Sequence, residues 1–414
     1  MTMIRDNYLD ISKLIKNKKI LLLFRVVEQH GGVLRFVGGA VRDALKGLKG
    51  FDLDLATDLS PDELVEACQE EGLKTVPIGI KFGTVGVIID DTVLEVTSLR
   101  KDIKTDGRHA EVEFTDNWEE DASRRDLTIN AVYADKKGNV FDYYNGIGDL
   151  EKGVVRFIGN AAQRIKEDYL RILRFFRFYS IFGEGEIDAK ALQACVENRE
   201  GLTSLSMERI RDEIFKILLT PKVVKTIQIM MDNNILGYIM PDPPYLDKLD
   251  FLVKMVDKHH IPFRALRRLF IIYQPDTALA ENLAFRLRLN KKEKQLFVDL
   301  AANNIALDDL LNPQKLQQLI YRYGAEFCQE KILLQAAIEQ KDVPEMDKII
   351  AQIKSLSVPV FPLKGSDIIN QGIDDQRKTS SVLKELEKVW IDSNFSLSKE
   401  ELLQKRKQIN PVNS

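Results

Sequence analysis

The pattern of apolar and polar positions changes near residue 160. Before that point, short alternating or continuous apolar runs lie between Gly, Asp and Asn, which predicts strands and tight turns. "GTVGVIID" and "TVLEVTSL" flank Asp90-Asp91, and "NAVYAD" and "NVFDYYN" flank Lys136-Lys137-Gly138. Each pair predicts a β-hairpin. Residues 33–150 are therefore expected to form a small mixed sheet with a few helices.

After residue 160 almost every segment is amphipathic at helical spacing. Examples are "QRIKEDYLRILRFFRFYSIF", "MERIRDEIFKILL", "PFRALRRLFIIY", "ENLAFRLRL" and "PQKLQQLIYRYG". No segment recurs at a fixed period, so a solenoid is not expected. A chain of 414 residues is also too long for one ordinary core. The predicted fold class is α+β, with a small mixed-sheet head followed by all-α domains.

Two aspartates stand one residue apart in "FDLDLA", where apolar residues alternate with them. Residues i and i+2 of a strand share a face, so Asp52 and Asp54 are expected to lie side by side. Neighbouring carboxylates repel each other unless a cation lies between them, and Mg²⁺ prefers oxygen ligands that it shares with substrate phosphates. Asp52 and Asp54 are therefore candidate catalytic residues and metal ligands. A solvent-exposed strand edge is the simpler alternative.

The glycine pair Gly38-Gly39 follows an apolar run and precedes a helical segment. Backbone N–H groups at such a turn can approach a phosphate closely, and Arg42 can add charge-assisted hydrogen bonds to a triphosphate. Alone, a glycine pair is also typical of an ordinary turn. Together with the two aspartates it favours a nucleotide site. The P-loop and Rossmann glycine patterns are both absent from the sequence.

The segment "EDYLRILRFFRF" places Asp168, Arg171, Arg174 and Arg177 at three-residue steps on a predicted helix. Asp168 and Arg171 would be neighbours on one face, which fits an intrahelical ion pair. The same pair matches the pairing edges of cytosine and adenine, because a carboxylate accepts from the amine and a guanidinium donates to the ring nitrogen. Uracil and guanine would leave polar groups unpaired. The pair is therefore also a candidate for base selection.

The composition limits the class of protein. The formal net charge of −3 gives no general attraction to nucleic acid, so RNA binding would need a local basic stripe. No apolar run reaches membrane-spanning length, and charged residues near the N-terminus break a signal-peptide pattern. The three cysteines are scattered and predict neither a disulfide framework nor a metal cluster. A cytoplasmic protein with no membrane partner is expected.

The motifs "GGAVRD…DLDLAT", "RRDLTIN", "FDYYNGIGDLEKGVVRFIG" and "EDYLRILRFFRF" resemble, in this order, those of the class II tRNA nucleotidyltransferases, the CCA-adding enzymes. The segment "SMERIRDEIFKIL" resembles the motif that follows. The resemblance is dense from about Arg35 to Leu219. It implies a polymerase-β-like nucleotidyltransferase head at residues 1–155, a helical neck for base recognition at 156–220, a body at 221–300 and a tRNA-binding tail at 301–414.

The resemblance also implies an activity. This is template-independent addition of C, C and A to the 3′ end of tRNA from CTP and ATP, with release of pyrophosphate and with Mg²⁺ as cofactor. Asp52 and Asp54 would hold the metal ions. The nucleotide-binding residues that the resemblance implies are Gly39, Arg42, Arg125, Asp168, Arg171, Arg174 and Arg177.

Within that set the implied roles differ. Gly39 and Arg42 would contact the triphosphate, and Arg125 would bind the nucleotide and its ribose with support from Asp126 and Asn130. Asp168 and Arg171 would form the amino-acid template for CTP and ATP. Arg174 and Arg177 would line the same pocket.

Several features stay open at the level of sequence. The polar segment 98–114 is expected to be a mobile loop, and the resemblance implies that it helps the switch from CTP to ATP. Glu95 is either a third active-site carboxylate or a structural strand residue. "LKGSDIINQGI" resembles a late family motif, but "DDQRKTS" follows where the family has a Pro-Gly turn. The oligomeric state and the tail residues that contact tRNA are not indicated.

Four alternative functions compete with this one. A bacterial poly(A) polymerase shares the head and most motifs but usually has a more basic C-terminal extension than "EELLQKRKQINPVNS". A partial enzyme would add only C or only A. A phosphatase-like hydrolase needs a doubly wound sheet, which the helical remainder does not supply. A non-catalytic RNA-binding protein would have no need for the two aspartates beside the glycine pair.

Overall fold

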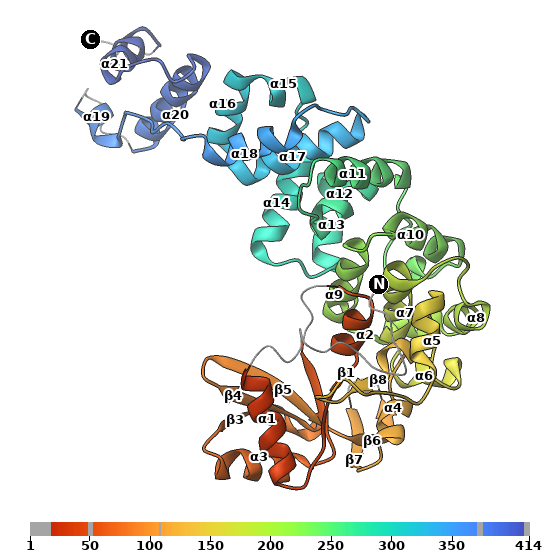
Figure 1. Ribbon diagram of the computed structural model, residues 1–414. Helices are drawn as coiled ribbons and strands as arrows, with labels where there is room; N and C mark the ends of the chain where they lie inside the picture. Colours follow the sequence, from red (N-terminus) through yellow and green to blue (C-terminus); the bar gives the residue numbers. More distant parts are fainter. Residues whose placement is uncertain (1–17, 49–52, 107–108, 371–375, 410–414) are drawn as a thin grey trace. The chain divides into compact units, whose positions relative to one another are not determined.

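The computed structural model describes residues 18–48, 53–106, 109–370 and 376–409 (Figure 1). The chain divides into two compact units, Met1–Asp242 and Pro243–Ser414, and each is described here by itself. The α+β class is confirmed, because the sheet lies in the first unit and the second unit is helical. The finer division into head, neck, body and tail stays a prediction.

A mixed sheet of seven strands, counted over the described residues, forms the first part of Met1–Asp242. The strand order is β3-β4-β5-β2-β1-β8-β9, and only the β2–β5 pair is parallel among these described strands. The strands are β1 (Leu34–Val37), β2 (Asp54–Thr57), β3 (Lys74–Gly79), β4 (Thr84–Ile89), β5 (Thr92–Ser98), β8 (Val132–Ala134) and β9 (Val140–Asp142). Both predicted hairpins, β4–β5 and β8–β9, are confirmed.

Helices and short 3₁₀ turns surround and follow this sheet. They are α1 (Lys18–Gln29), α2 (Gly39–Leu45), α3 (Pro61–Glu70), η1 (Ile80–Phe82), α4 (Trp118–Ser123), η2 (Thr128–Asn130), α5 (Gly146–Lys152), α6 (Ala161–Glu167), α7 (Leu170–Phe182), α8 (Ala189–Glu197), η3 (Arg199–Ser204), α9 (Met207–Leu218), α10 (Val223–Asp232) and η4 (Leu236–Tyr238).

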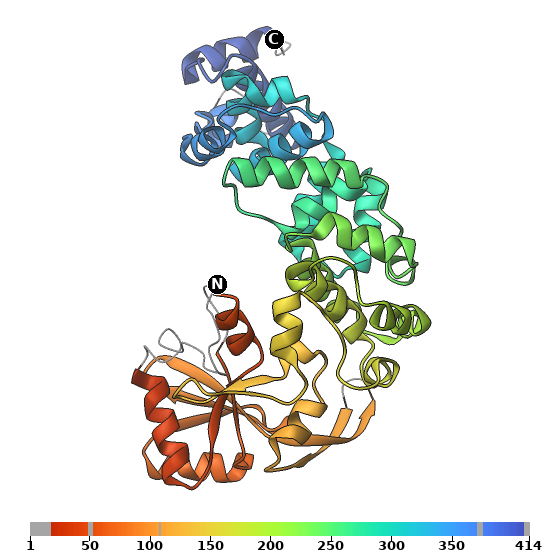
Figure 2. The ribbon, with the colours of Figure 1, turned by 45° about the vertical axis from the view of Figure 1, so that its right-hand side comes forward.

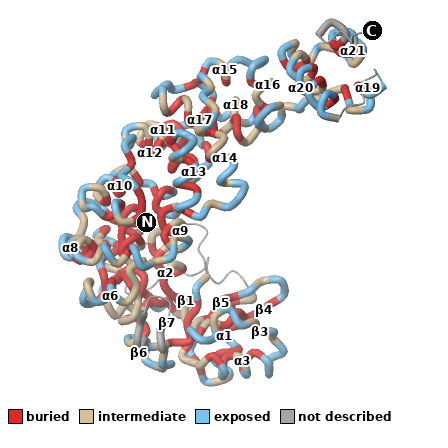
Figure 3. Tube along the Cα trace, turned by 180° about the vertical axis from the view of Figure 1, so that it is seen from behind, coloured by how far each residue is buried: buried red, intermediate tan, exposed pale blue. Residues whose placement is uncertain are grey.

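Neighbouring residues of a strand point to opposite faces of the sheet, and apolar residues of β1 are packed on both faces. On one face α1 and α3 pack against the strands (Figure 2), and the Phe24 and Phe36 rings lie 5.3 Å apart. On the other face Val37, next to Phe36 on β1, joins a core cluster with Trp118 and Tyr133. Strand β1 is therefore mostly buried (Figure 3), and it carries the glycine turn at its end.

Segment 98–114 differs from the expectation of a loop. It forms an antiparallel pair, β6 (Arg100–Asp106) and β7 (His109–Phe114), apart from the main sheet. The first strand has no apolar alternation in its sequence, "RKDIKTD", whereas the second, "HAEVEF", does alternate and could have been predicted as a strand.

The segment that begins at Gln163 also differs, because it is two helices and not one. Helix α6 ends at Glu167 and α7 begins at Leu170, so Asp168 lies between them with extended backbone angles. Its Oδ1 accepts a hydrogen bond of 3.1 Å from the backbone N–H of Leu170. A short acidic side chain that bonds the nearby backbone in this way offers an alternative to continued helix.

In the unit Pro243–Ser414, the described secondary structure consists of helices joined by loops. Its helices are α11 (Leu246–Lys258), α12 (Ala265–Tyr273), α13 (Thr277–Arg286), α14 (Lys291–Ala302), α15 (Leu307–Leu311), α16 (Pro313–Tyr323), α17 (Ala325–Ile338), α18 (Met346–Ser355), α19 (Gly365–Ile369), α20 (Gln376–Asp392) and α21 (Lys399–Ile409). Each of the described helices in the chain is too short or too polar to span a bilayer.

Helix α17 is the centre of this second unit, since α11, α12, α14, α16 and α18 all pack on it. Its Glu330 is buried and accepts hydrogen bonds from Arg264 and Arg267 of the α12 region at 2.7–2.9 Å. Three charge-assisted bonds compensate for the loss of water around this carboxylate. Helices α19–α21 enclose a second cluster around Trp390 and Leu386.

A close approach between α5 and η2 makes Gly146 a structural requirement. A Cβ atom at Gly146 would lie 2.2 Å from the backbone oxygen of Thr128. Backbone atoms cannot move aside cheaply, so Gly146→Ala should destabilise the fold by about 1–3 kcal/mol, as overpacking does. The melting temperature should drop by several degrees in differential scanning calorimetry.

Gly79→Ala is the matched control for this substitution. The nearest atom to a Cβ at Gly79 would be 3.8 Å away, and its φ of −162° lies outside the left-handed region. Its melting temperature should stay within about one degree of the wild-type value. Equal melting temperatures for the two variants would contradict the close contact.

Candidate functional site

One polar cavity of about 590 Å³ lies within the unit Met1–Asp242. It is bounded by the β1–α2 turn, the start of β2, the segment around η2, and helices α7 and α9. The residues that line it are Gly38, Gly39, Arg42, Asp43, Asp54, Arg124, Arg125, Asp126, Asn130, Asp168, Leu170, Arg171, Arg174, Arg177, Phe178, Ile181 and Arg209.

The glycine turn forms one wall of this cavity. Gly38 has φ 61° and ψ −118°, a conformation that residues with a Cβ rarely adopt, and α2 begins at the next residue. A Cβ atom on Gly39 would lie 3.6 Å from Asp54 Oδ2 and 3.7 Å from Arg42 Nη2. The missing side chain of Gly39 therefore leaves space between a carboxylate and a guanidinium.

Asp54 is the first residue of β2, and its side chain is exposed to the cavity. Asp52, the other predicted metal ligand, lies outside the described residues. Asp54 is in register with Glu95 on the parallel neighbour β5, so the two side chains lie on the same face of the sheet. Glu95 is exposed as well. Among the described residues no group of three or more His, Cys, Asp or Glu side chains converges.

Arg42 is buried at the base of the cavity. Its Nε donates to Asp43 Oδ1 at 2.8 Å, and its Nη1 donates to Asn130 Oδ1 at 2.5 Å. The guanidinium carbon lies 4.9 Å from the ring centre of Phe178 and 4.7 Å from that of Phe182. Two hydrogen bonds and two aromatic rings therefore fix the direction in which this charge points.

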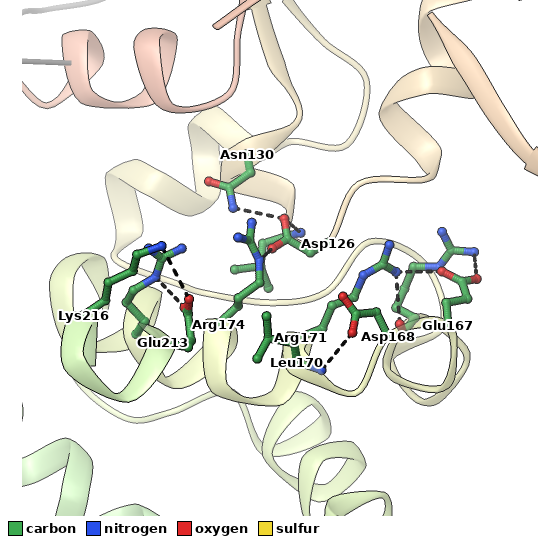
Figure 4. Close-up of polar contacts among 12 residues, drawn as sticks. Asp126, Asn130, Glu167, Asp168, Leu170, Arg171, Arg174, Glu213 and Lys216 are labelled. Carbon is green, nitrogen blue, oxygen red and sulfur yellow. Dashed lines mark hydrogen bonds and ion pairs between the residues drawn. The ribbon is translucent and has the colours of Figure 1, made fainter. Parts of the chain in front are cut away.

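Asn130 continues this chain of hydrogen bonds to helix α7 (Figure 4). Its amide nitrogen donates to Asp126 Oδ1 at 3.1 Å, and Arg174 Nε donates to Asp126 Oδ2 at 2.6 Å. Burial of Asp126 opposes its ionisation, but Arg174 and Asn130, with the nearby charge of Arg171, together hold the pKa of the carboxyl well below its usual range. Asp126 therefore stays charged and ties α7 to η2.

A second buried carboxylate, Asp121, holds the adjacent arginines. Arg124 donates to Oδ1 at 2.5 and 2.8 Å, while Arg125 and the Tyr133 hydroxyl donate to Oδ2 at 2.7–3.2 Å. Burial works against the charge of Asp121, but Arg125 and Arg124 lower its pKa to about 2. Asp121 is one per cent exposed and does not line the cavity, so it holds both arginines from the protein interior while their side chains face the cavity.

The predicted partners Asp168 and Arg171 do not pair with each other (Figure 4). Asp168 Oδ2 accepts from Arg209 Nη2 at 2.7 Å. Arg171 donates to Glu167 at 2.6 Å and to the backbone oxygens of Arg164 and Arg124 at 3.0 Å. The alternative of an intrahelical Asp168–Arg171 ion pair is therefore wrong, because Asp168 precedes α7 and its carboxylate contacts Arg209 of α9.

Arg177 is the last predicted arginine on α7. Its Nε lies 2.7 Å from Glu213 Oε1 of α9, an ion pair that is not aligned as a hydrogen bond. Its guanidinium is also 4.5 Å from the ring centre of Phe178. Burial lowers the pKa of Arg177 below its ordinary value, and Glu213 acts against that shift.

The cavity brings together nearly all of the predicted site residues. Those that line it are Gly39, Arg42, Asp54, Arg125, Asp126, Asn130, Asp168, Arg171, Arg174 and Arg177. Sequence reasoning missed Arg209, which contacts Asp168. The sequence feature that could have indicated Arg209 is its position in "MERIRDEIF", four residues before Glu213 and on the same face of α9.

Family descriptions match two segments of the chain. "Poly A polymerase head domain" matches residues 34–156, and "Probable RNA and SrmB- binding site of polymerase A" matches residues 186–246. The chain is 37% identical to the mitochondrial CCA tRNA nucleotidyltransferase 1 of Homo sapiens over 93% of this chain and 88% of that protein. It is 31% identical to the CCA-adding enzyme of Staphylococcus haemolyticus over 80% of each chain.

Solved structures share the fold. The Bacillus stearothermophilus CCA-adding enzyme in complex with CTP superposes with a TM-score of 0.78 at 24% identity, over 95% of this chain and 97% of that one. The Thermotoga maritima CCA-adding enzyme complexed with tRNA_CCA gives a TM-score of 0.63 at 21% identity, over 98% of this chain and 100% of that one.

The low pKa of Asp121 predicts an acid-sensitive contribution to stability. An unfolded aspartate has a pKa of about 3.9, whereas the folded value is about 2. The contribution is therefore present above about pH 4 and is lost as the pH falls toward 2. Asp121→Asn should be less stable than wild type at pH 7, and the difference should shrink between pH 4 and 2 in urea unfolding.

Asp116→Asn provides the control, because it removes the same charge from an exposed position in the same region. Its stability difference from wild type should stay small at every pH. A constant difference between Asp121→Asn and wild type from pH 7 to 2.5 would rule out the assigned pKa.

Proposed function

Because the chain belongs to the CCA tRNA nucleotidyltransferases, we propose that the cavity in Met1–Asp242 is the site of its reaction and assign its residues to individual steps. The enzyme adds C, C and A to the 3′ end of tRNA from CTP and ATP without a nucleic-acid template, and it releases pyrophosphate. One observation carries the assignment. A single cavity combines an exposed carboxylate, a glycine turn and seven guanidinium groups.

The nucleotidyltransferase superfamily uses divalent metal, and we propose Mg²⁺ as the ion. The residues present fit it, because Asp54 offers oxygen ligands beside the space that Gly39 leaves, and Glu95 lies in register on the same face. Asp54, Glu95 and the predicted ligand Asp52 would hold the ion. When bound, Mg²⁺ supplies charge stabilisation for the attacking and leaving oxygens of phosphoryl transfer.

Protein groups supply the rest of the phosphate binding. Arg42, held by Asp43 and Asn130, would donate to the triphosphate and offset the charge that develops on pyrophosphate as it leaves. The 3′ hydroxyl oxygen of tRNA attacks the α-phosphorus, and the bond to the bridging oxygen of pyrophosphate breaks. The contribution of the protein is therefore positioning and electrostatic stabilisation.

Arg125 lies beside the glycine turn and would bind the ribose or its phosphate. A Cβ atom on Gly38 would stand 3.6 Å from Arg125 Nη1, so the guanidinium approaches the turn closely. Asp121 and Tyr133 hold the other edge of Arg125. Its orientation is thus set before a nucleotide binds.

Base selection is assigned to Asp168 and Arg171, although they do not pair. The hydrogen bonds of Arg171 to Glu167, Arg164 and Arg124 use three of its five N–H donors. Asp168 accepts one bond on each oxygen, which leaves further lone pairs. Neighbouring residues hold each side chain in place, and each keeps unused hydrogen-bonding groups that can bind the edge of a base. This supports recognition of C and A.

The cellular location remains a proposal. We propose the cytoplasm for this chain, on the basis of its composition. The similar human protein is named as mitochondrial, so localisation of a tagged full-length chain is the deciding experiment.

The activity is tested with purified protein, Mg²⁺ and a tRNA transcript that lacks its 3′ CCA. With CTP and ATP together, two C residues and one A should be added, after which extension stops. With each nucleotide alone, CTP should give two C residues, and UTP and GTP should give no addition. Long A tails without C would support a poly(A) polymerase, and C-only or A-only products would support a partial enzyme.

The metal-binding carboxylates are tested in the same assay. Asp54→Asn should lower kcat at least about 100-fold, because a neutral amide binds a divalent ion weakly. Glu95→Gln should lower kcat about 10–100-fold and raise the Mg²⁺ concentration that gives half-maximal rate.

Asp91→Asn is the matched control, since it removes a carboxylate from the exposed β4–β5 turn of the same sheet. It should retain wild-type kcat and Mg²⁺ dependence. If Glu95→Gln behaves as Asp91→Asn does, Glu95 is a structural strand residue and not a ligand.

A further inference from the structure

Tyr133 is fully buried and does not line the cavity, although it lies beside the glycine turn. It is on β8, and the backbone oxygen of its neighbour Val132 accepts from the Gly38 N–H at 3.1 Å. Its ring packs edge-on against Trp118, with 5.3 Å between ring centres, and against Tyr143 at 6.1 Å. The core of the first unit therefore fixes where the Tyr133 hydroxyl lies.

The Tyr133 hydroxyl contacts two charged groups. It donates to Asp121 Oδ2 at 2.7 Å and accepts from Arg125 Nε at 3.2 Å. An ionised carboxylate can only accept and a guanidinium can only donate, so the two partners fix the direction of the single hydroxyl proton. Burial is the largest cause that raises the pKa of Tyr133, so the hydroxyl keeps this proton at neutral pH.

Asp121 alone does not fix the orientation of Arg125. Both Arg125 Nε and Nη2 donate to the same atom, Asp121 Oδ2, at 3.2 and 3.0 Å. Two donors on one oxygen leave the guanidinium able to pivot about that oxygen, unlike a fork that binds both oxygens of a carboxylate. The other oxygen, Oδ1, accepts from Arg124. The bond from Nε to Tyr133 is a third contact, and it stops this pivot.

The opposite edge of Arg125 faces the cavity. Arg125 Nη1 lies 3.6 Å from the position of a Cβ atom on Gly38, at the glycine turn. Among the described residues, the hydrogen bonds of Arg125 involve Nε and Nη2 and not Nη1. The two N–H groups of Nη1 are therefore available to a ligand. A rotation of the guanidinium about Asp121 Oδ2 would move them away from the turn.

We propose that Tyr133 is a positioning residue, which holds Arg125 in the rotation that directs Nη1 toward the bound nucleotide. The proposal rests on the proposed function, because it takes Arg125 as a nucleotide-binding residue. It goes beyond that function in assigning a role in substrate affinity to a buried hydroxyl that does not touch the substrate. Arg125 is assigned to the ribose or its phosphate, which CTP and ATP share. Tyr133 is therefore expected to act on both nucleotides equally.

The test measures steady-state addition by the full chain. One tRNA transcript lacks CCA and takes CTP, and another ends in CC and takes ATP. Tyr133→Phe removes only the hydroxyl oxygen, and it should raise KM for CTP and for ATP by the same factor, about 3–10-fold, as loss of one hydrogen bond does. An orientation set before binding serves the ground state and the transition state alike, so kcat should stay within about two-fold. KM for tRNA should not change.

Tyr143→Phe is the matched control. It removes a hydroxyl from the same aromatic cluster, but this hydroxyl accepts from Arg35 at 3.3 Å, and Arg35 does not line the cavity. KM for both nucleotides should equal the wild-type value. Both variants keep the ring, so they should fold, and circular dichroism at the assay temperature checks this.

A double-mutant cycle separates positioning from a general effect on the core. Arg125→Met has no N–H donor in its side chain and keeps an unbranched, flexible chain that fills the space. In this background Tyr133→Phe should cause no further rise in KM, because no guanidinium is left to position. If Arg125→Met adds nucleotides too slowly for kinetics, CTP binding in isothermal titration calorimetry gives the same comparison. If it does not fold, the equal rise for CTP and ATP at constant kcat decides the proposal.

The outcomes separate this proposal from the proposed function. Wild-type protein that adds no nucleotide would defeat the proposed function. With active wild type, the proposal on Tyr133 alone is overturned if its KM values equal those of Tyr143→Phe, if KM rises for only one nucleotide, or if Tyr133→Phe raises KM as much in the Arg125→Met background. A lower kcat at unchanged KM would also overturn it.

Discussion

Seven guanidinium groups point toward one cavity, and their mutual repulsion is the constraint on which the site depends. The described residues meet it by placing a carboxylate beside each guanidinium. The pairs are Arg42 with Asp43, Arg124 and Arg125 with Asp121, Arg171 with Glu167, Arg174 with Asp126, Arg177 with Glu213, and Arg209 with Asp168. Six carboxylates are thus shared among the seven arginines and limit their mutual repulsion, and Asp54 adds one further carboxylate, which is not among these pairs.

Several of these pairs join elements that are distant in the sequence, so the site and the fold of the first unit depend on each other. Asp126 and Arg174 are 48 positions apart and connect the segment beside the sheet to α7. Asn130 links the same carboxylate to Arg42 on α2. A buried charge that loses its partner costs far more than a surface pair contributes. The network therefore fixes α7 against the glycine turn, and it sets the distance between Arg42 and the arginines of α7.

The sequence predicts those parts of the molecule that are encoded locally. The glycine turn, the two hairpins and the carboxylate on β2 all follow from residues within a few positions of one another. The break at Asp168 and the Arg209 contact could not be found in this way, because a single hydrogen bond to Leu170 decides the first and the packing of α9 on α7 decides the second. Pairing between distant charges has no periodic signal in one sequence.

The break between α6 and α7 changes how base selection has to be understood. A helical Asp168–Arg171 pair would neutralise itself and would need to open before a base could bind. Because Arg209 holds Asp168 and Glu167 holds Arg171, the remaining hydrogen-bonding groups of each side chain do not depend on those of the other. A base with an amine beside a ring-nitrogen acceptor can hydrogen-bond to both side chains. A base with the reverse arrangement of donor and acceptor would leave both side chains unpaired, and unpaired polar groups are costly in a desolvated site. Under the proposed assignment, base specificity would depend on the two pairs that hold Asp168 and Arg171, and α9 would take part in base recognition together with α7.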